Sequence, residues 1–311
     1  MFDAVIALAG LISGLALLIF ASDKAVEHSV SIASILKVPS LMIGLMLVSI
    51  GTDLPEISNS IVSSARMHGD INVGDSLGSV LAQISLMLGL FPLFGGKFNV
   101  KRDEIIVIGA CEVLALIAAV SMVEKGYLSR MNAIFLVASW PILMLIIRKV
   151  MKQEPPPTQN NKNLPYHLLL VILGYVGVAI GSIVVIESVI NLSSIFRIHE
   201  YILSFFGVAI GTSLPELVVD LTAIRKKQYE IAIGDIIGSC IVDASLSIGI
   251  GPLFFAPTAV SGGLAETTGL YALLVSIIVL LTLALREKVD RKTGVFFIIL
   301  YVLSYLTLYK S

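Results

Sequence analysis

The sequence is poor in charge, in cysteine and in histidine. Only 14% of its 311 residues are charged, 57% are hydrophobic, and the mean hydropathy is +0.96. So little charge excludes an ordinary soluble globular protein and predicts an integral membrane protein in a lipid bilayer. The formal net charge of -1, and the lack of a basic stripe with interleaved aromatics, exclude a nucleic-acid partner.

The sequence gives little support for a disulfide or for a metal site made of cysteine and histidine. The two cysteines, Cys111 and Cys240, lie far apart in apolar runs, so we expect packing residues and no disulfide. Neither residue type occurs at metal-ligand spacing, which argues against zinc or copper. The tripeptides "VGD" at 73–75 and "IGD" at 233–235 resemble part of an intramembrane aspartyl protease motif, but that enzyme class needs Gly-x-Gly-Asp, and Asn72 and Ala232 stand where the first glycine should be. We therefore expect neither an enzyme nor a bound cofactor.

Apolar runs of roughly 20 residues predict ten membrane helices. The leading residues, Met1-Phe2-Asp3, carry no positive charge and the apolar run continues to about Phe20. We interpret this run as the first span rather than as a secretory signal. The predicted spans lie near residues 4–22, 39–66, 71–95, 104–123, 129–150, 165–190, 200–225, 230–255, 268–285 and 293–309.

Lysine and arginine are unevenly divided between the two sides that ten spans define. The side of the termini receives five of the 21, namely Arg66, Lys125, Arg130, Arg197 and Lys310, and the other side receives the remaining sixteen. Cytoplasmic loops are enriched in these residues. The division predicts a multi-pass plasma-membrane protein, expected to be a monomer, with both termini extracytoplasmic.

The longest polar segment, residues 151–163, contains three consecutive prolines and cannot join a membrane helix. We interpret it as a cytoplasmic linker between a first half, 1–150, and a second half, 164–311. A ligand for a proline-recognition domain is the less favoured alternative, because the loop is short.

The sequence contains an internal repeat. Residues 50–94 align without a gap to residues 210–254 at an offset of 160, and 17 of 45 positions are identical. The identities include polar residues, glycines and prolines as well as apolar side chains. Because each half contains five predicted spans, the second half enters the membrane in the opposite sense. The predicted fold is therefore an all-α membrane protein of two inverted five-helix repeats, with broken helices at the midplane.

The sequences "GTDLPE" at 51–56 and "GTSLPE" at 211–216 are the predicted helix breaks. Proline removes a backbone donor and clashes with the carbonyl four residues earlier, so Pro55 and Pro215 should loosen carbonyls near Gly51 and Gly211. Loosened carbonyls at membrane depth are tolerated only beside a cavity, a partner or an ion.

Polar side chains at helical spacing accompany each break. Thr52 shares a helix face with Glu56, and Thr212 with Glu216. In the following spans Ser79 shares a face with Gln83, and Ser239 with Asp243. Hydroxyls, carboxylates, an amide and carbonyls make an all-oxygen cage, and hard cations such as Ca²⁺ take six to eight oxygens of these kinds.

Simple packing is the alternative for part of this pattern. Gly-x3-Gly at 74–78 and 234–238 is typical of close helix contact. For Glu56 and Glu216 the alternative is weak, because a mid-span charge costs about 2.5 kcal/mol or more and the two positions are symmetric.

These paired motifs resemble the alpha repeats of the Ca²⁺/cation antiporters, in particular the sodium/calcium exchangers of prokaryotes. In that family G-T-S-x-P-E is followed by G-S-x3-N/D, matched here by "GTDLPE" with "GSVLAQ" and by "GTSLPE" with "GSCIVD". The resemblance implies a central diamond of four residues, further side-chain oxygens, and two backbone carbonyls. The diamond is Glu56, Glu216, Gln83 and Asp243; the further oxygens come from Thr52, Thr212, Ser79, Ser239 and Ser213; the carbonyls are those of Ser49 and Ala209.

The sequence departs from the family pattern at several positions. Asp53 stands at the usual Ser, Gln83 at an Asn or Asp, and Asp75 and Asp235 at the usual Asn. We include Asp53 among the expected ion-binding residues. Extra carboxylates can bind a proton or a further cation.

Secondary active exchange of Ca²⁺ for Na⁺ by alternating access is the function that follows. The candidate moving helices are 4–22 and 165–190, which precede the breaks at the same offset and carry Gly14 and Gly174 in register. The surplus aspartates keep Ca²⁺/H⁺ antiport open as the alternative. A cation channel or uniporter is less favoured, since it would more naturally show one uninterrupted pore ring.

Overall fold

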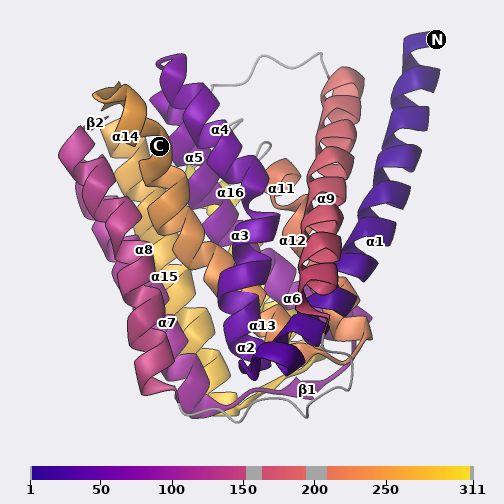
Figure 1. Ribbon diagram of the computed structural model, residues 1–311. Coiled ribbons are helices and arrows are strands. Elements are labelled where there is room, and N and C mark those ends of the chain that lie inside the picture. The colour runs from indigo at the N-terminus through magenta and orange to yellow at the C-terminus, as the bar shows by residue number, and fades with distance from the viewer. Residues whose placement is uncertain (1, 152–162, 194–208, 309–311) are drawn as a thin grey trace.

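The computed structural model describes residues 2–151, 163–193 and 209–308, which form a bundle of helices (Figure 1). The predicted linker and the start of the predicted seventh span lie outside the described residues. In the first half the elements are α1 (Phe2–Leu36), α2 (Ser40–Ile43), η1 (Gly44–Val48), α3 (Ser49–Thr52), α4 (Leu54–Ala65), α5 (Gly69–Leu81), η2 (Ala82–Met87), α6 (Leu88–Phe94), α7 (Arg102–Val123) and α8 (Arg130–Val150). In the second half they are α9 (Leu164–Ser193), α11 (Ala209–Thr212), α12 (Leu214–Arg225), α13 (Tyr229–Val242), η4 (Asp243–Ser247), α14 (Ile248–Phe255), α15 (Gly262–Arg286) and α16 (Arg291–Leu308).

The described residues contain six helices long and apolar enough to cross a membrane, or seven if the bent segment Ser40–Ala65 is counted as one span. The protein is therefore a helical membrane protein, and the full set of ten inverted spans stays a prediction. The first helix is longer than the predicted span 4–22, because α1 continues to Leu36. Its polar stretch exposes Lys24 and Glu27 but buries Ala25 and Val26, so the helix persists past its apolar run.

Two short β-ribbons join the halves. Strand β1 (Phe98–Asn99) pairs antiparallel with β4 (Lys288–Val289), and β2 (Tyr127–Leu128) pairs antiparallel with β3 (Thr258–Ala259). In Figure 1 the ribbon of β1 lies at the bottom of the bundle and that of β2 at the top, on the side of the N-terminus. At the offset of 160, Phe98 corresponds to Thr258 and Leu128 to Lys288, so the repeats place equivalent strands at opposite ends of the molecule.

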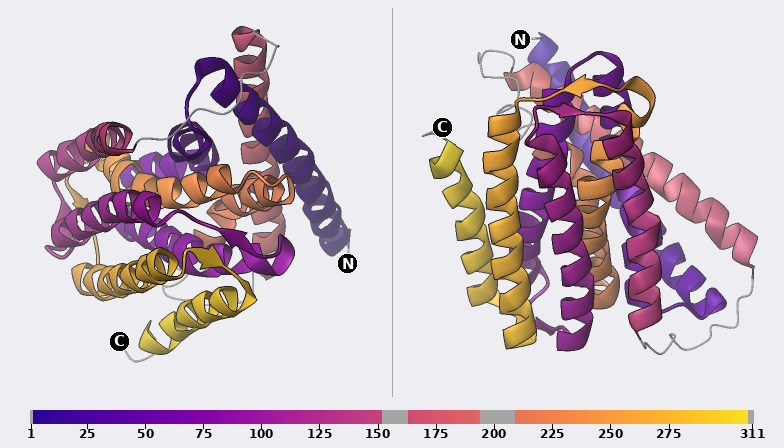
Figure 2. Two further views of the ribbon diagram at one scale, coloured as in Figure 1. Left: turned by 90° about the horizontal axis from the view of Figure 1, so that it is seen from below. Right: turned by 90° about the vertical axis from the view of Figure 1, so that its left-hand side faces the viewer.

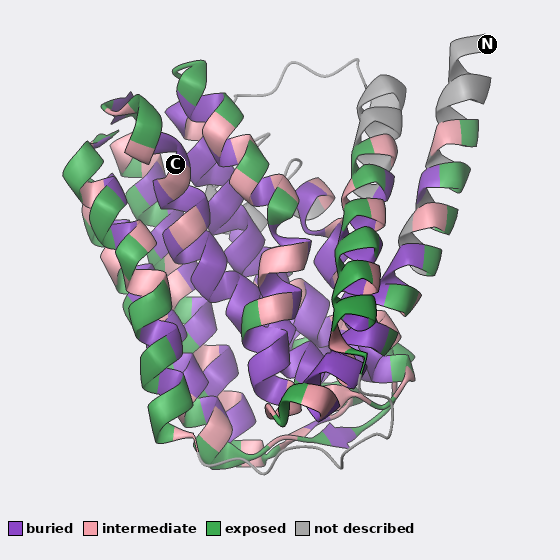
Figure 3. Cartoon of the chain, in the orientation of Figure 1, coloured by how far each residue is buried: buried purple, intermediate pink, exposed green. Residues whose placement is uncertain are grey.

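The centre of the bundle is formed by the spans Gly69–Phe94 and Tyr229–Phe255, which are the most buried of the spans. Figure 3 shows buried residues gathered on the central helices and exposed residues on the outer faces of helices such as α8 and α9. Those outer faces are apolar, with exposed Leu145, Ile172 and Leu281. In a membrane protein such faces suit contact with lipid.

Close backbone contact fixes α13 against the broken segment. A Cβ on Gly238 would lie 2.8 Å from the Cα of Leu45, and one on Gly234 would meet the carbonyl of Leu41. Small residues let two helices approach in this way. The packing interpretation of the glycine pair at 234–238 is therefore confirmed.

Helices α1 and α9 pack along one another at the edge of the bundle (Figures 1 and 2). A Cβ on Gly174 would lie 3.1 Å from the Cα of Ala25, and one on Gly177 would lie 2.9 Å from the Cβ of Ala21. Nearer one end of the pair, His28 and His167 hydrogen-bond through their Nδ1 atoms at 2.9 Å. The predicted pair of mobile helices thus forms a single packed unit.

Candidate functional site

Both predicted helix breaks are present, and each is centred on the residue before Leu-Pro-Glu. Asp53 has φ −75° and ψ 6°, and Ser213 has φ −81° and ψ 12°, so both leave the α-helical region. In the first half the break bends the chain by 45°. Pro55 lies at the start of α4, where its missing N–H is tolerated. The two motifs therefore predicted the breaks correctly. In the structure each break lies two residues after the glycine of its motif, Gly51 or Gly211.

Three carboxylates converge at the breaks. Oxygens of Asp53, Glu56 and Glu216 all lie within 4.8 Å of one another. Each of these residues is at most 1% exposed. Asp243 lies close enough to interact electrostatically with all three. Asp53, which departs from the family pattern, is thus a member of the cluster.

Two π-helical segments carry the remaining members of the predicted diamond. Asp243 begins η4, and Gln83 lies in η2, on the equivalent turn of the first half. Gln83 lies beside Asp243, and its Oε1 accepts a weak hydrogen bond from the Cys240 thiol at 3.4 Å. A π-helical turn inside an α-helix is uncommon and is frequent at functional sites. Its presence in both repeats indicates that the directions of the Gln83 and Asp243 side chains depend on it.

The hydroxyls predicted for the site link the two halves. Ser213 donates to Glu56 Oε1 at 3.3 Å and lies 3.0 Å from the Ser79 hydroxyl. Thr212 donates to Asp75 at 2.9 Å, and Thr52 lies 3.4 Å from Asp235. Ser239 is also fully buried. Each break is therefore held by side chains of the opposite repeat.

The two predicted backbone ligands occupy equivalent positions. The Ser49 carbonyl accepts from Asp53 N at 2.9 Å and from the Thr52 hydroxyl at 3.2 Å. The Ala209 carbonyl accepts from Ser213 N at 3.0 Å and from the Thr212 hydroxyl at 3.2 Å. Both carbonyls thus face the last turn before a break, and the Ala209 carbonyl also accepts from the Ser79 hydroxyl of the first half at 3.5 Å.

Many oxygens of the cluster have no hydrogen-bond partner among the described residues. They include both oxygens of Asp53, Glu216 and Asp243, one oxygen of Glu56, and the hydroxyl of Ser239. Buried carboxylates without donors are very costly unless a cation or a proton neutralises them. The arrangement is suited chemically to holding hard cations, which prefer carboxylate and hydroxyl oxygens.

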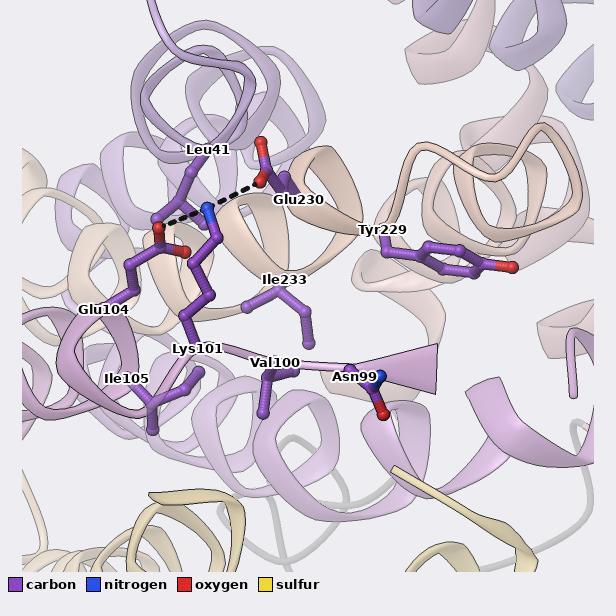
Figure 4. Close-up of a pocket in the computed structure, with 9 residues that line it drawn as sticks. All are labelled: Leu41, Asn99, Val100, Lys101, Glu104, Ile105, Tyr229, Glu230 and Ile233. Carbon is purple, nitrogen blue, oxygen red and sulfur yellow. Dashed lines mark hydrogen bonds and ion pairs between the residues drawn. The ribbon is translucent and has the colours of Figure 1, made fainter. Parts of the chain in front are cut away.

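Two surface pockets lie away from these carboxylates. Figure 4 shows one at the β1 end of the bundle, where Lys101 forms ion pairs of 2.8 Å with Glu104 and 3.1 Å with Glu230. The hydrogen bonds that Lys101 donates to Glu104 and, to a lesser extent, to Glu230 raise the pKa of Lys101. A second groove, of about 660 Å³, runs between α1 and α12 and is lined in part by Thr222 and Lys226. The carboxylate cluster lies apart from both, in the closed interior.

Sequence reasoning missed three polar residues near the site or within the core. Asn59 donates to Asp75 at 2.5 Å, and Asp220 lies beside Asp235. Glu112 of α7 is fully buried and accepts from Ser276 at 2.8 Å. The signal was present, because Asn59 and Asp220 follow Glu56 and Glu216 by three and four residues and Glu112 is a carboxylate within a predicted span.

Apolar helices of membrane length, arranged around buried carboxylates on broken segments, define a polytopic membrane transporter. The chain belongs to the family described as sodium/calcium exchanger protein, whose sequence profile matches residues 6–149 and 166–310. The predicted membership of the Ca²⁺/cation antiporter superfamily is confirmed. The family is one of cation antiporters and not of enzymes.

Two relatives illustrate the similarity in sequence. The inner membrane protein YrbG of Escherichia coli is 32% identical over 267 residues, which is 81% of each chain. The sodium/calcium exchanger MaX1 of Methanosarcina acetivorans is 26% identical over 334 residues, covering 94% of this chain and 95% of the relative.

A solved structure of the sodium-calcium exchanger NCX_Mj has a closely similar fold. The TM-score is 0.81 at 27% sequence identity, and the match covers 98% of this chain and 99% of the exchanger.

Proposed function

We propose that this protein exchanges Ca²⁺ for Na⁺ across the membrane by alternating access. The observation that carries the proposal is the convergence of Asp53, Glu56 and Glu216 within 4.8 Å, at two broken helices from opposite repeats. The family membership and the similarity to the sodium-calcium exchangers NCX_Mj and MaX1 support the choice of ions. The transported cations are the only ligands we assign to the site.

Ca²⁺ would bind among Glu56, Glu216, Asp243 and Gln83. The hydroxyls of Thr52, Thr212, Ser79, Ser239 and Ser213, the carbonyls of Ser49 and Ala209, and the Asp53 carboxylate would supply oxygens for this ion or for Na⁺. A set of carboxylates that accepts one Ca²⁺ or several Na⁺, but not both loads together, gives exchange. Exchange also requires that the empty, negatively charged site does not change sides.

An inverted repeat is part of the proposal and would allow alternating access. The equivalent ribbons β1–β4 and β2–β3 lie at opposite ends of the bundle (Figure 1), as two repeats of opposite orientation require. Transporters of this architecture bind substrate between the repeats near the midplane. We assign ten spans in two five-helix repeats, residues 1–150 and 164–311.

Helices α1 and α9 are the proposed moving unit. They pack on each other over their length. Helix α1 also contacts α12, and α9 contacts α3, α11 and α12, which adjoin the two breaks. Sliding of this unit along the rest of the bundle would open the site to one side and then to the other. The positive-inside rule orients the molecule, with the β1–β4 end, which carries Lys97, Lys101 and Lys288, facing the cytoplasm of a plasma membrane.

Ca²⁺/H⁺ antiport is the second candidate, and a specific observation favours it. Asp53 adds a carboxylate to the central cluster where the sodium/calcium exchangers usually have Ser. A carboxylate among carboxylates binds protons more readily than an isolated one. We therefore expect residue 53 to be the main determinant of whether Na⁺ or H⁺ is the counter-ion.

Ca²⁺ uptake into vesicles containing the purified protein tests the proposal. Uptake is driven first by an outward Na⁺ gradient at equal pH, and then by a pH gradient without Na⁺. We expect uptake in the first case and little in the second. Uptake in the second alone would select H⁺ as the counter-ion, and flux without either gradient would select a channel.

Charge-removing variants connect the activity to the site. Glu56→Gln and Glu216→Gln should each abolish uptake, because each removes a carboxylate from the central cluster. Glu266→Gln is the matched control, since Glu266 is exposed on α15. Unchanged uptake in both Gln variants would refute the antiporter assignment.

A further inference from the structure

The Cys240 thiol lies inside the bundle and contacts a residue of the ion site. Cys240 is on α13 and is 0% exposed. Its Sγ lies 3.4 Å from Oε1 of Gln83 and 3.8 Å from the carbonyl oxygen of Val80, both in the first half. The sequence predicted a packing residue here. The structure shows in addition that the thiol has two hydrogen-bond acceptors within reach.

This contact lies where the two repeats meet. Val80 corresponds to Cys240 at the offset of 160, so each of these residues lies against its own counterpart. Gln83 corresponds in the same way to Asp243. A valine side chain has no donor, so Val80 cannot offer Asp243 what Cys240 offers Gln83. The thiol therefore makes the two repeats unequal at the ion site.

A thiol distinguishes the two ends of the Gln83 amide. Its S–H group is a weak donor, and only the oxygen end of an amide can accept the hydrogen. The other end, Nε2, is buried and has no hydrogen-bond partner among the described residues. Asp243, whose two oxygens also lack a partner there, lies beside Gln83. With Oε1 held by Cys240, the amide is left to offer Asp243 its N–H groups, which suits a site without a cation.

A bound cation requires the opposite orientation of this amide. Ca²⁺ takes amide oxygens as ligands, whereas the N–H groups are donors and repel it. To bind Ca²⁺ beside Asp243, the Gln83 amide must turn by about half a revolution about its last torsion, which is soft and roughly two-fold. Oε1 then leaves the thiol, and the S–H group of Cys240 keeps the Val80 carbonyl as an acceptor.

We propose that Cys240 is a positioning residue, which lowers the affinity of the site for Ca²⁺ by holding the Gln83 oxygen in the orientation without a cation. The thiol and the cation compete for one oxygen, so the affinity should fall as the donor at position 240 becomes stronger. The inference rests on the proposed function insofar as Gln83 is a ligand of Ca²⁺. It concerns how tightly the site binds, and not which residues carry its charge.

Equilibrium dialysis of the purified protein with radioactive Ca²⁺ measures this affinity without transport. Cys240→Val has no donor and carries the residue of the first half, and it should bind Ca²⁺ about 3-fold more tightly. Cys240→Ala should shift the affinity in the same direction, although it leaves space where valine fills it. Cys240→Ser, whose hydroxyl is a stronger donor than a thiol, should bind Ca²⁺ about 3-fold more weakly.

Cys111 provides the matched control, because it is the other buried cysteine and lies on α7, outside the site. Cys111→Val and Cys111→Ser should leave the affinity for Ca²⁺ unchanged. Packing defects at position 240 would weaken binding, or leave it unchanged, in all three variants of Cys240. Shifts of opposite sign for valine and serine are therefore a result that packing alone does not give.

A second background tests whether the effect passes through Gln83. Gln83→Asn draws the amide back by about one bond length, roughly 1.5 Å, out of reach of the thiol, and keeps an amide oxygen for the cation. In this background Cys, Val and Ser at position 240 should bind Ca²⁺ equally. Shifts that persist in Gln83→Asn would overturn the inference, because the effect would not pass through Gln83.

The inference and the proposed function fail in different ways. Equal affinities of Cys240→Val and Cys240→Ser in the protein with Gln83, or losses in both, would overturn the positioning role and leave Na⁺/Ca²⁺ exchange intact. Opposite shifts in Ca²⁺ affinity in a protein without Na⁺-driven uptake would support the positioning role and overturn the proposed exchange.

Discussion

The ring of Tyr175 lies directly against Gly51, since a Cβ on Gly51 would be 2.6 Å from the ring atoms Cγ and Cδ2. Gly51 lies in α3, two residues before the first break. Tyr175 belongs to α9, which we assign to the moving unit. The contact therefore joins the moving helices to the ion site. The ring leaves space for the hydrogen atoms of Gly51 but not for a Cβ.

Gly51→Ala should slow exchange about 5-fold to 150-fold, because overpacking of about 1–3 kcal/mol would affect the contact that must slide. Ca²⁺ binding at equilibrium should change less than the initial rate of uptake in vesicles. Gly51→Ala combined with Tyr175→Leu should recover part of the rate. Gly263→Ala is the control, because a Cβ there meets nothing within 4 Å. Normal rates in Gly51→Ala would show that the two helices do not move past each other.

Asp53→Ser should reduce the effect of acid on Ca²⁺ binding. Asp53 lies within 4.8 Å of Glu56 and Glu216, so a proton on any of these carboxylates weakens the attraction for Ca²⁺. Binding that displaces one proton weakens about tenfold for each unit of pH below the titration range. With one carboxylate fewer, the variant should show a shallower fall in affinity between pH 8 and about pH 5.

Equilibrium dialysis at a series of pH values measures this slope, and Na⁺-driven uptake should persist in Asp53→Ser. Glu266→Gln again provides the exposed control. A slope as steep as that of the unmodified protein would mean that Asp53 takes no part in proton competition. Loss of Na⁺-driven uptake, with pH-driven uptake intact, would instead favour H⁺ as the counter-ion.

The internal repeat made much of this arrangement predictable. Because Gly, Pro and Glu recur at a fixed offset, the sequence located both breaks and indicated that Glu56 and Glu216 belong together. Asp53 was expected among the ion-binding residues, but its place within 4.8 Å of Glu56 and Glu216 could not be derived from spacing, since the direction of its side chain depends on the φ and ψ angles at the break. Likewise, Asp220 meets Asp235 through the rotation of α12 relative to α13, which no spacing within one helix reveals.

Other features depended on tertiary packing. The π-helical turns η2 and η4 have no signature in residue propensity, and they were not predicted. The extension of α1 to Leu36 was missed because Asp23, Lys24 and Glu27 look like a loop in an apolar sequence. In the structure they lie on the outer face of a helix whose other face packs on the bundle.

Single cysteines at the two ends of the bundle should be labelled from opposite sides of the membrane. Lys97 precedes β1 and Lys125 precedes β2, and both are exposed. Native Cys111 and Cys240 are 4% and 0% exposed and should give little background. In intact cells a membrane-impermeant maleimide should label Lys125→Cys but not Lys97→Cys. The reverse pattern would invert the proposed orientation, and labelling of both would contradict the assignment of α7, which lies between them, as a membrane span.

A crosslink between α1 and α12 should stop exchange, whereas one between α1 and α9 should not. The hydroxyls of Ser22 and Thr222 lie 3.2 Å apart, so Ser22→Cys with Thr222→Cys places two thiols within reach of a disulfide. Oxidation would tie the moving unit to a site-bearing helix. Uptake should fall to the background of empty vesicles and return after reduction.

The matched control is Ala21→Cys with Gly177→Cys, because a Cβ on Gly177 would be 2.9 Å from that of Ala21. This disulfide joins α1 to α9 inside the same unit and leaves their common movement free. Equal loss of uptake in both oxidised pairs would show that α1 and α9 must separate during transport. Uptake retained after complete oxidation of the first pair would place the moving parts elsewhere in the bundle.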